Sequence, residues 1–317
     1  MKIKARVLSL FTVAAFFFSC SNDGAKHAPY TDTPTSGEIL ILADESYEPL
    51  IQVQIDTFQE IYVKAKINVR YLPEEELFKQ LMNNDTVRIA ITARDLNDAE
   101  RKDFEVRTIV PRNLRIASDG VALIVNPENP DTLLTTDQLQ SILQGKYSTW
   151  KDLSVTGIKD SILVVFDKNG SANARYLKEK FLGDKSFPKN SYATNSSAAV
   201  VEYVSKTKGA IGVIGVNWIS DSDDSTTTSF LDKIKVMGIS QMDSAGVQLD
   251  YYKPFQAYIA LKSYPLIRDI MIVNIEGRSG LGTGFASFAV GDQGQRLVRL
   301  MGMLPATMPI RILKVNS

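Results

Sequence analysis

The sequence predicts an α/β fold in which mostly parallel β-sheets are covered by helices on both faces. Strand-like apolar runs alternate with amphipathic helical segments along most of the chain, the order that builds parallel sheets. The 317 residues suffice for two domains with separate cores. The 36 basic and 36 acidic residues balance without a basic cluster, so no nucleic-acid partner is expected.

The first elements form a β-α-β-α-β unit. A helix is predicted from Ser46, whose hydroxyl is a natural N-cap, and its apolar residues recur every three to four positions. A second helix over 74–82 has an acidic first turn, which suits the helix dipole. Asn97 and Glu100 form a capping box that begins a third helix. The strands of this unit are predicted at 38–43, 66–71, 87–92 and 115–125.

A second set of elements follows the strand that ends this unit. Its residues 121–125 are all apolar, which is typical of a strand covered on both faces. Thr135 and Gln138 form a capping box, and Gly145 fits the C′ position where that helix ends. Tyr147 and Trp150 are expected to pack in this part. The other predictions are strands at 161–166 and 210–216, helices from Ser171 and Ser196, and a surface loop at 220–229.

The N-terminus has the pattern of a secretory signal. Basic residues precede an apolar run over 7–18 that is short for a membrane span. Cys20 follows directly, as in a lipoprotein signal, so we expect cleavage after residue 19 and a lipid on Cys20. The alternative is an incidental cysteine in an uncleaved signal anchor. Residues 21–36 then form a flexible tether, which places the protein in the cell envelope, periplasm or cell surface.

The composition excludes several kinds of catalytic site. The one histidine and the one cysteine both lie within the first 30 residues. The folded part therefore has no His/Cys zinc site, Ser-His-Asp triad or Cys-His nucleophile. The glycines at 280, 282 and 284 lack the G-x-G-x-x-G spacing of a dinucleotide site. We expect no enzyme, no metal and no cofactor.

Several short sequence motifs occur in the same order as in the PstS-like phosphate-binding proteins of ABC transporters, a branch of the periplasmic binding proteins that this chain therefore resembles. The similarity covers about residues 37–314. It implies two lobes joined by crossing hinge strands, with 37–119 and 252–317 as lobe 1 and 120–251 as lobe 2. The motifs are Asp119–Pro127, Leu134–Leu139, Gly145-Lys146, Trp150-Lys151, Tyr264–Arg268, Gly284-Phe285 and Gly294-Gln295.

This resemblance implies a monomeric protein that closes its lobes on a small oxyanion, above all phosphate, and delivers it to an ABC permease. The departures from the family pattern at Asp44, Glu45 and Asp167 motivate an alternative. In that reading the protein is an envelope-anchored sensor or scaffold whose ligand site is changed or vestigial.

The resemblance also places ligand contacts in the turns that follow strands, where open α/β sheets bind ligands. Ser46 in the first turn is a candidate; the alternative is capping alone. Arg94 in the second turn has the planar fork that suits an oxyanion, although it could instead pair with Asp95 or Asp98.

The third turn holds the candidates Ser171, Asn173 and Arg175. The family has an arginine where this chain has Asp167, and Arg175, one helical turn beyond Ser171, could supply that charge. The alternative is an ordinary capped helix start. Asp119 at the lobe crossing could accept the proton of hydrogenphosphate, or simply fix the hinge strand.

Overall fold

The computed structural model describes residues 31–154, 157–220, 225–242 and 246–309, with the side chains of 225–228 left aside. The predicted signal sequence, Cys20 and most of the tether lie outside these residues. The chain divides into two compact units, 1–31 and 32–317, and all that follows concerns the second. Within the described residues, no helix has the length and apolar character needed to cross a membrane.

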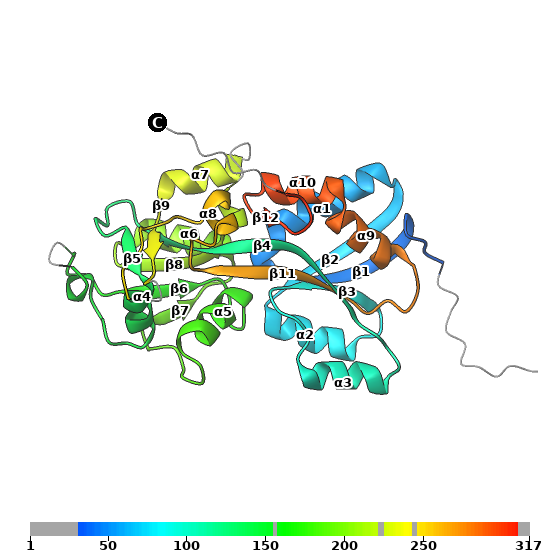
Figure 1. The fold of residues 1–317 in the computed structure, drawn as a ribbon, viewed down its shortest axis with the longest axis horizontal. Coiled ribbons are helices and arrows are strands. Elements are labelled where there is room, and N and C mark those ends of the chain that lie inside the picture. Colours follow the sequence, from blue (N-terminus) through cyan, green and yellow to red (C-terminus); the bar gives the residue numbers. More distant parts are fainter. Residues whose placement is uncertain (1–30, 155–156, 221–224, 243–245, 310–317) are drawn as a thin grey trace, which may run out of the picture. The chain divides into compact units, whose positions relative to one another are not determined.

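The first sheet has the strand order β2-β1-β3-β11-β4 (Figure 1). Strands β1, β2 and β3 are parallel, and β11 runs antiparallel to both of its neighbours. The predicted β-α-β-α-β unit is therefore confirmed. The strands are β1 (Ser36–Asp44), β2 (Lys64–Leu72), β3 (Val87–Thr92), β4 (Arg112–Val125), β11 (Ile267–Asn274) and the short β12 (Leu304–Pro305), which pairs with β4.

Helices cover both faces of this sheet. On one face Phe58 packs edge-on against Phe285, with ring centroids 5.7 Å apart, in a core shared by α1, α9 and α10. On the other face α2 and α3 contribute Leu77 and Phe104 to a separate apolar cluster. The helices are α1 (Glu48–Ile61), α2 (Glu74–Asn83), α3 (Asp98–Val106), α9 (Leu281–Val290) and α10 (Asp292–Leu300).

Strand β4 belongs to two sheets. Residues 112–120 pair with β11, and residues 121–125 pair with β8 of the second sheet. All five residues of this second part are fully buried, as the unbroken apolar run predicted. One continuous strand thus carries the chain from the first sheet into the second (Figure 1).

The second sheet continues with β8, β6 and β7. Strand β6 is parallel to both neighbours. The strands are β6 (Leu163–Phe166), β7 (Ser191–Ala193), β8 (Ala210–Gly215) and β9 (Lys235–Val236), beside a separate parallel pair of β5 (Leu133–Thr135) and β10 (Gly238–Ser240). The helices are α4 (Thr136–Leu143), α5 (Ala172–Phe181), α6 (Ser197–Lys206), α7 (Ser225–Lys233) and the short α8 (Gln256–Ala260).

The local signals around α4 are confirmed. Thr135 and Gln138 form the capping box at its start. At its end Gly145 has a φ of 72°, and the amides of Gly145 and Lys146 bond back to the carbonyls of residues 142 and 141. This is the Schellman pattern that a C′ glycine permits. Trp150 is buried and donates to the Gly209 carbonyl at 3.0 Å.

Two local predictions are wrong. The first helix does not begin at Ser46, which lies in a 3-10 turn over Glu45–Tyr47 whose N-cap is Asp44. Helix α1 begins at Glu48, and Pro49, whose fixed φ suits a first helical turn, follows at once. The loop predicted at 220–229 is helical from Ser225, where α7 begins.

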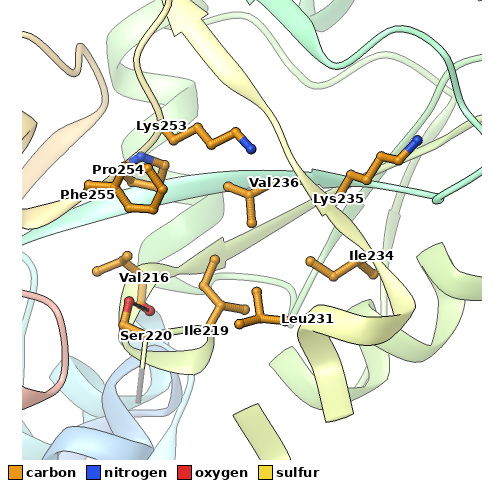
Figure 2. Close-up of a pocket in the computed structure, with 10 residues that line it drawn as sticks. All are labelled: Val216, Ile219, Ser220, Leu231, Ile234, Lys235, Val236, Lys253, Pro254 and Phe255. Atoms are coloured by element: carbon orange, nitrogen blue, oxygen red, sulfur yellow. Dashed lines mark hydrogen bonds between the residues drawn. The ribbon is translucent and has the colours of Figure 1, made fainter. Parts of the chain in front are cut away.

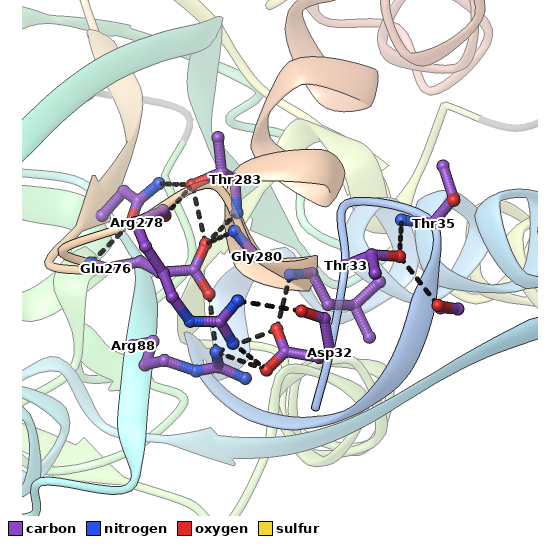
Figure 3. Close-up of polar contacts among 11 residues, drawn as sticks. Asp32, Thr33, Thr35, Arg88, Glu276, Arg278, Gly280 and Thr283 are labelled. Atoms are coloured by element: carbon purple, nitrogen blue, oxygen red, sulfur yellow. Dashed lines mark hydrogen bonds and ion pairs between the residues drawn. The ribbon is translucent and has the colours of Figure 1, made fainter. Parts of the chain in front are cut away.

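The first described residues are attached to the first sheet by an N-terminal carboxylate cluster of Asp32, Arg88, Glu276 and Arg278 (Figure 3). Asp32 accepts from the Leu281 amide at the start of α9 (2.7 Å) and from Arg88 (2.9 Å). The lobe boundaries implied by the resemblance stay predictions. Below, "first half" means residues 32–119 and 252–309, and "second half" means 120–251.

Candidate ligand-binding site

The turns that follow β1 and β6 touch each other. The Ser46 hydroxyl donates to Asp167 Oδ2 at 3.0 Å, and the Ala172 amide donates to Asp44 Oδ2 at 3.2 Å. Two of the predicted ligand turns, one from each half, are therefore in direct contact. We call the buried carboxylates here, Asp44, Glu74 and Asp167, with the groups that bind them, the cleft cluster.

Asp44 bridges the two halves. It is fully buried, and its Oδ1 accepts from the Ser46 amide at 2.8 Å while Oδ2 accepts from the first turn of α5. Burial, followed by the nearby charges of Glu74 and Asp167, raises the pKa of Asp44 to about 7. Asp44 thus places an acidic group at the N-terminus of α5, a position whose backbone amides attract anions in general.

Asp167 is also fully buried. Its Oδ2 accepts from Ser46 and from Asn173 Nδ2, the latter at 2.8 Å. Asp167 Oδ1 and Asn173 Oδ1 have no hydrogen-bond donor within the described part of the chain. Buried acceptors without partners are costly, and these two are acceptors that a ligand or water could satisfy.

Ser171 caps α5. Its hydroxyl accepts from the Ala174 amide at 3.3 Å, and the side chain is buried. This contact matches the alternative of an ordinary capped helix start. A ligand contact of Ser171 stays a prediction.

Glu74, at the start of α2, draws the two predicted arginines together. Its Oε2 accepts from the Thr92 hydroxyl (2.7 Å), the Ala93 amide (3.1 Å) and Arg175 Nη2 (3.3 Å). Arg175 Nε also bonds Oε1, from which Arg94 Nε lies 3.8 Å away. Sequence reasoning noted the acidic first turn of α2 only for its effect on the helix dipole.

Arg94 is held mainly within its own turn. Its two terminal nitrogens each bond a Glu100 carboxylate oxygen at 2.8 Å, and its guanidinium lies 3.4 Å from the centre of the Phe78 ring. An ion pair was the expected alternative, but the carboxylate partner is Glu100 rather than Asp95 or Asp98. Arg94 reaches Asp95 only through that residue's carbonyl, at 2.9 Å.

Asp119 is paired within the hinge region. Its Oδ1 accepts from the Val216 amide at 3.2 Å, and Oδ2 accepts from Arg268 Nε (3.2 Å) and Nη2 (3.0 Å). Burial raises the pKa of Asp119, against the charge of Arg268. Both oxygens are occupied, which fits the alternative in which Asp119 fixes the hinge strand. The role of Arg268 was missed. The available signal was its place just before the apolar run over 270–273, since an arginine beside a buried strand needs an ionic partner.

The carbonyl of Ser46 adds further contacts between the halves. It accepts from Asn217 Nδ2 at 2.9 Å and from Trp218 Nε1 at 3.0 Å. Lys168 and Glu45 form another ion pair across the same boundary. The halves are therefore held together by polar contacts made by the chain itself.

Two cavities lie away from these turns. One, of about 320 Å³, has mainly apolar walls with Lys235 and Lys253 among its lining residues (Figure 2). Another, of about 300 Å³, lies near Pro34 and Phe288. Neither includes a predicted ligand residue. Among the described residues no group of His, Cys, Asp and Glu side chains is arranged to hold a metal ion.

Comparison with known proteins gives matches over most of the chain. Residues 28–293 match a family model described as a PBP superfamily domain. The phosphate-binding protein PstS of Bacillus subtilis (strain 168) is 24% identical over 313 residues, covering 96% of this chain and 95% of the relative. PstS of Staphylococcus epidermidis (strain RP62A) is 25% identical over 251 residues, covering 78% and 72%.

Solved structures show the same fold. A putative phosphate ABC transporter substrate-binding protein with bound phosphate from Clostridium perfringens superposes with a TM-score of 0.70 at 23% identity, covering 85% of this chain and all of that one. An ABC-type phosphate transport receptor from Vibrio cholerae gives 0.63 at 20% identity, with the same coverage. The predicted α/β fold with two lobes is confirmed.

Proposed function

This chain belongs to the PBP superfamily, and on that premise we propose that it is a substrate-binding protein for an ABC transporter. It captures a small oxyanion, phosphate, between its two halves and presents it to a permease. The relatives named above are phosphate-binding proteins, and the chain spans nearly the full length of the Bacillus relative. The role is binding and not catalysis.

One observation carries the choice of an oxyanion. The Thr92 hydroxyl, the Ala93 amide and the Arg175 guanidinium converge on a single carboxylate oxygen of Glu74. These donors come from both halves, and they are the kinds of donor that bind phosphate oxygens in proteins. A cradle that holds a carboxylate in this way has the right chemistry for another oxyanion.

We propose a hinge mechanism for capture. Strand β4 runs from the first half into the second and would bend as the halves separate. In the open form Arg175 leaves Glu74, and phosphate enters between the turns. The proposed ligand contacts are those predicted from the sequence: Ser46, Arg94, Asp119, Ser171, Asn173 and Arg175.

The envelope location is proposed on the same footing. The signal pattern at residues 1–20 supports export, and Cys20 would carry a lipid that holds the domain on the membrane through the tether. We propose that the protein works as a monomer. Labelling of cells with a radioactive fatty acid should mark the wild-type chain and leave a Cys20→Ser variant unmarked.

The ligand is tested with protein purified without denaturation. Mass spectrometry of the released small molecules should find phosphate, and added phosphate should raise the melting temperature more than sulfate or molybdate does. Reversing charge with Arg94→Glu and Arg175→Glu should abolish that effect. Equal phosphate affinity in the wild type and in both variants would refute the anion site.

A further inference from the structure

We propose that Glu74 is a specificity-determining residue that acts as an internal ligand. Its carboxylate occupies the anion position of the cleft, so an external oxyanion binds only by displacing it. This inference rests on the proposed oxyanion function and concerns the same site.

The hydrogen bonds of Glu74 are those expected of a bound anion. The side chain is buried, with 2% of its surface exposed. Its Oε2 accepts three bonds, from the Thr92 hydroxyl, the Ala93 amide and Arg175 Nη2, at 2.7, 3.1 and 3.3 Å. These bonds are not a cap of α2, because all three donors lie outside that helix. Glu75 and Glu76 also provide an acidic first turn.

Glu74 also connects the halves as a captured ligand would. It lies on α2 of the first half, and Arg175 lies on α5 of the second half, 101 residues further along the chain. Asp44 makes a comparable connection, because it accepts from Ser46 in its own turn and from Ala172 on α5. The chain therefore places one of its own carboxylates against the Ala93 amide and Arg175, and another against the Ala172 amide at the start of α5.

The charges around this position leave little room for a second anion. Arg175 also bonds Glu179, Arg94 bonds Glu100, and Lys168 bonds Glu45. Phosphate that entered beside Glu74 would face Glu74, Asp44 and Asp167 together, and repulsion between charges a few ångströms apart is severe in a buried site. Displacement of Glu74 frees the donors and removes one of these charges from the position.

This arrangement sets a lower limit on the ligands that the cleft accepts. A tethered carboxylate competes at high effective concentration, so a free monocarboxylate such as acetate cannot replace it. An oxyanion with more charge and more acceptor oxygens can. Glu74 thus selects phosphate over weak anions. It also lowers the apparent phosphate affinity, which equals the intrinsic affinity multiplied by the fraction of molecules in which Glu74 has left the position.

The test is calorimetric titration of the full mature chain with inorganic phosphate. Glu74→Gln keeps the size of the side chain but removes the charge that holds Arg175, and should bind phosphate at least about tenfold more tightly than the wild type. Glu75→Gln is the matched control, since it makes the same charge change in the same helical turn at an exposed position. It should leave the affinity unchanged.

A second arm uses acetate. Glu74→Ala removes the internal carboxylate, so acetate should raise the melting temperature of this variant and leave that of the wild type unchanged. Trp218 gives a readout of closure, because its indole contacts the Ser46 carbonyl of the other half. In the wild type, Trp218 fluorescence should be similar with and without phosphate, because Glu74 already holds the halves together. In the Glu74→Gln variant, the fluorescence should change when phosphate is added.

The outcomes separate the two proposals. If phosphate binds Glu74→Gln as weakly as the wild type or more weakly, Glu74 only positions Arg175, and the inference fails while the proposed function stands. If phosphate binds neither the wild type nor any variant, both fail. Should Glu74→Gln not fold, Glu74→Asp, which withdraws the carboxylate by one methylene, must bind phosphate more tightly than the wild type, or the inference is overturned.

Discussion

Both the N-terminal carboxylate cluster and the cleft cluster contain buried carboxylates that accept hydrogen bonds at helix N-termini, but the pKa of a carboxylate is lowered in the first and raised in the second. In the first, Asp32 and Glu276 meet two arginines, and Glu276 also accepts from the Gly280 and Thr283 amides at 3.0 and 2.7 Å (Figure 3). Although burial opposes it, the Leu281 amide, Arg88 and Arg278 lower the pKa of Asp32. In the cleft cluster no cation pairs with Asp44 or Asp167 in the described part of the chain, and the pKa of Asp44 is raised to about 7.

The comparison teaches that buried charge by itself does not mark a functional site. A carboxylate whose charge and hydrogen bonds are fully matched fixes the chain, whereas carboxylates with too few cations and with acceptor atoms left open are unstable unless something binds or protonates them. The first arrangement attaches the start of the domain. The second lies where the two halves meet.

The largest effect is expected in the N-terminal cluster. Arg88→Met leaves Asp32 and Glu276 buried with less compensating charge, and should lower the free energy of unfolding by about 3–5 kcal/mol. Urea unfolding measures it. The phosphate affinity should not change. Arg296→Met, which breaks an exposed pair with Asp292, is the control and should cost at most about 1 kcal/mol.

The next prediction concerns the pH dependence of stability, which should have opposite signs for Asp44 in the cleft cluster and Asp32 in the N-terminal cluster. The folded-state pKa of Asp44 lies above its ordinary value of 3.8, so its contribution to stability is present at low pH and lost as pH rises toward 7. The free energy of unfolding should fall by on the order of 2–3 kcal/mol between pH 5 and pH 8. Asp44→Asn should flatten this slope.

Asp32 provides the contrast. Its pKa is lowered, so its stabilising effect is present above the unfolded pKa of about 3.8 and is lost only in more acidic solution. Asp32→Asn should destabilise the protein without altering the slope between pH 5 and pH 8. A flattened slope in this variant, or an unchanged one in Asp44→Asn, would reverse the assignment of the two clusters.

A smaller effect on binding is expected at Arg175. Its charge-assisted bonds are worth roughly 1.5–3 kcal/mol each when a ligand uses them, so Arg175→Met should weaken phosphate binding by at least about tenfold. Calorimetric titration checks this. Lys178→Met, an exposed change on the same helix, should leave the affinity as it is. Equal losses in both variants would point to a general charge effect.

The smallest effect compares two capping serines. Ser171 and Ser196 accept from the N3 amides of α5 and α6, at 3.3 and 3.1 Å. Replacing either by alanine should lower the free energy of unfolding by about 1 kcal/mol. Only Ser171→Ala should also weaken phosphate binding. Unchanged affinity in that variant would leave Ser171 as a helix cap alone.

Much of the fold follows from local patterns. The capping boxes at Asn97 and Thr135, the C′ glycine at 145 and the buried run at 121–125 each act within a few residues, so the sequence predicts them directly. The start of α1 was mispredicted because Asp44 captured the Ser46 amide in a 3-10 turn ahead of Pro49. That competition between two local caps is not visible in the pattern alone.

The sequence by itself determined the β-α-β-α-β unit, most of the helices, the crossing strand and the turns that follow the parallel strands. Only the tertiary structure decided what the side chains in those turns bind. Ser46 meets Asp167 across 121 residues, and Glu74 meets Arg175 across 101. The reason is physical: secondary structure depends on neighbours in sequence, whereas the partner of a buried charge is set by the fold that brings distant segments together.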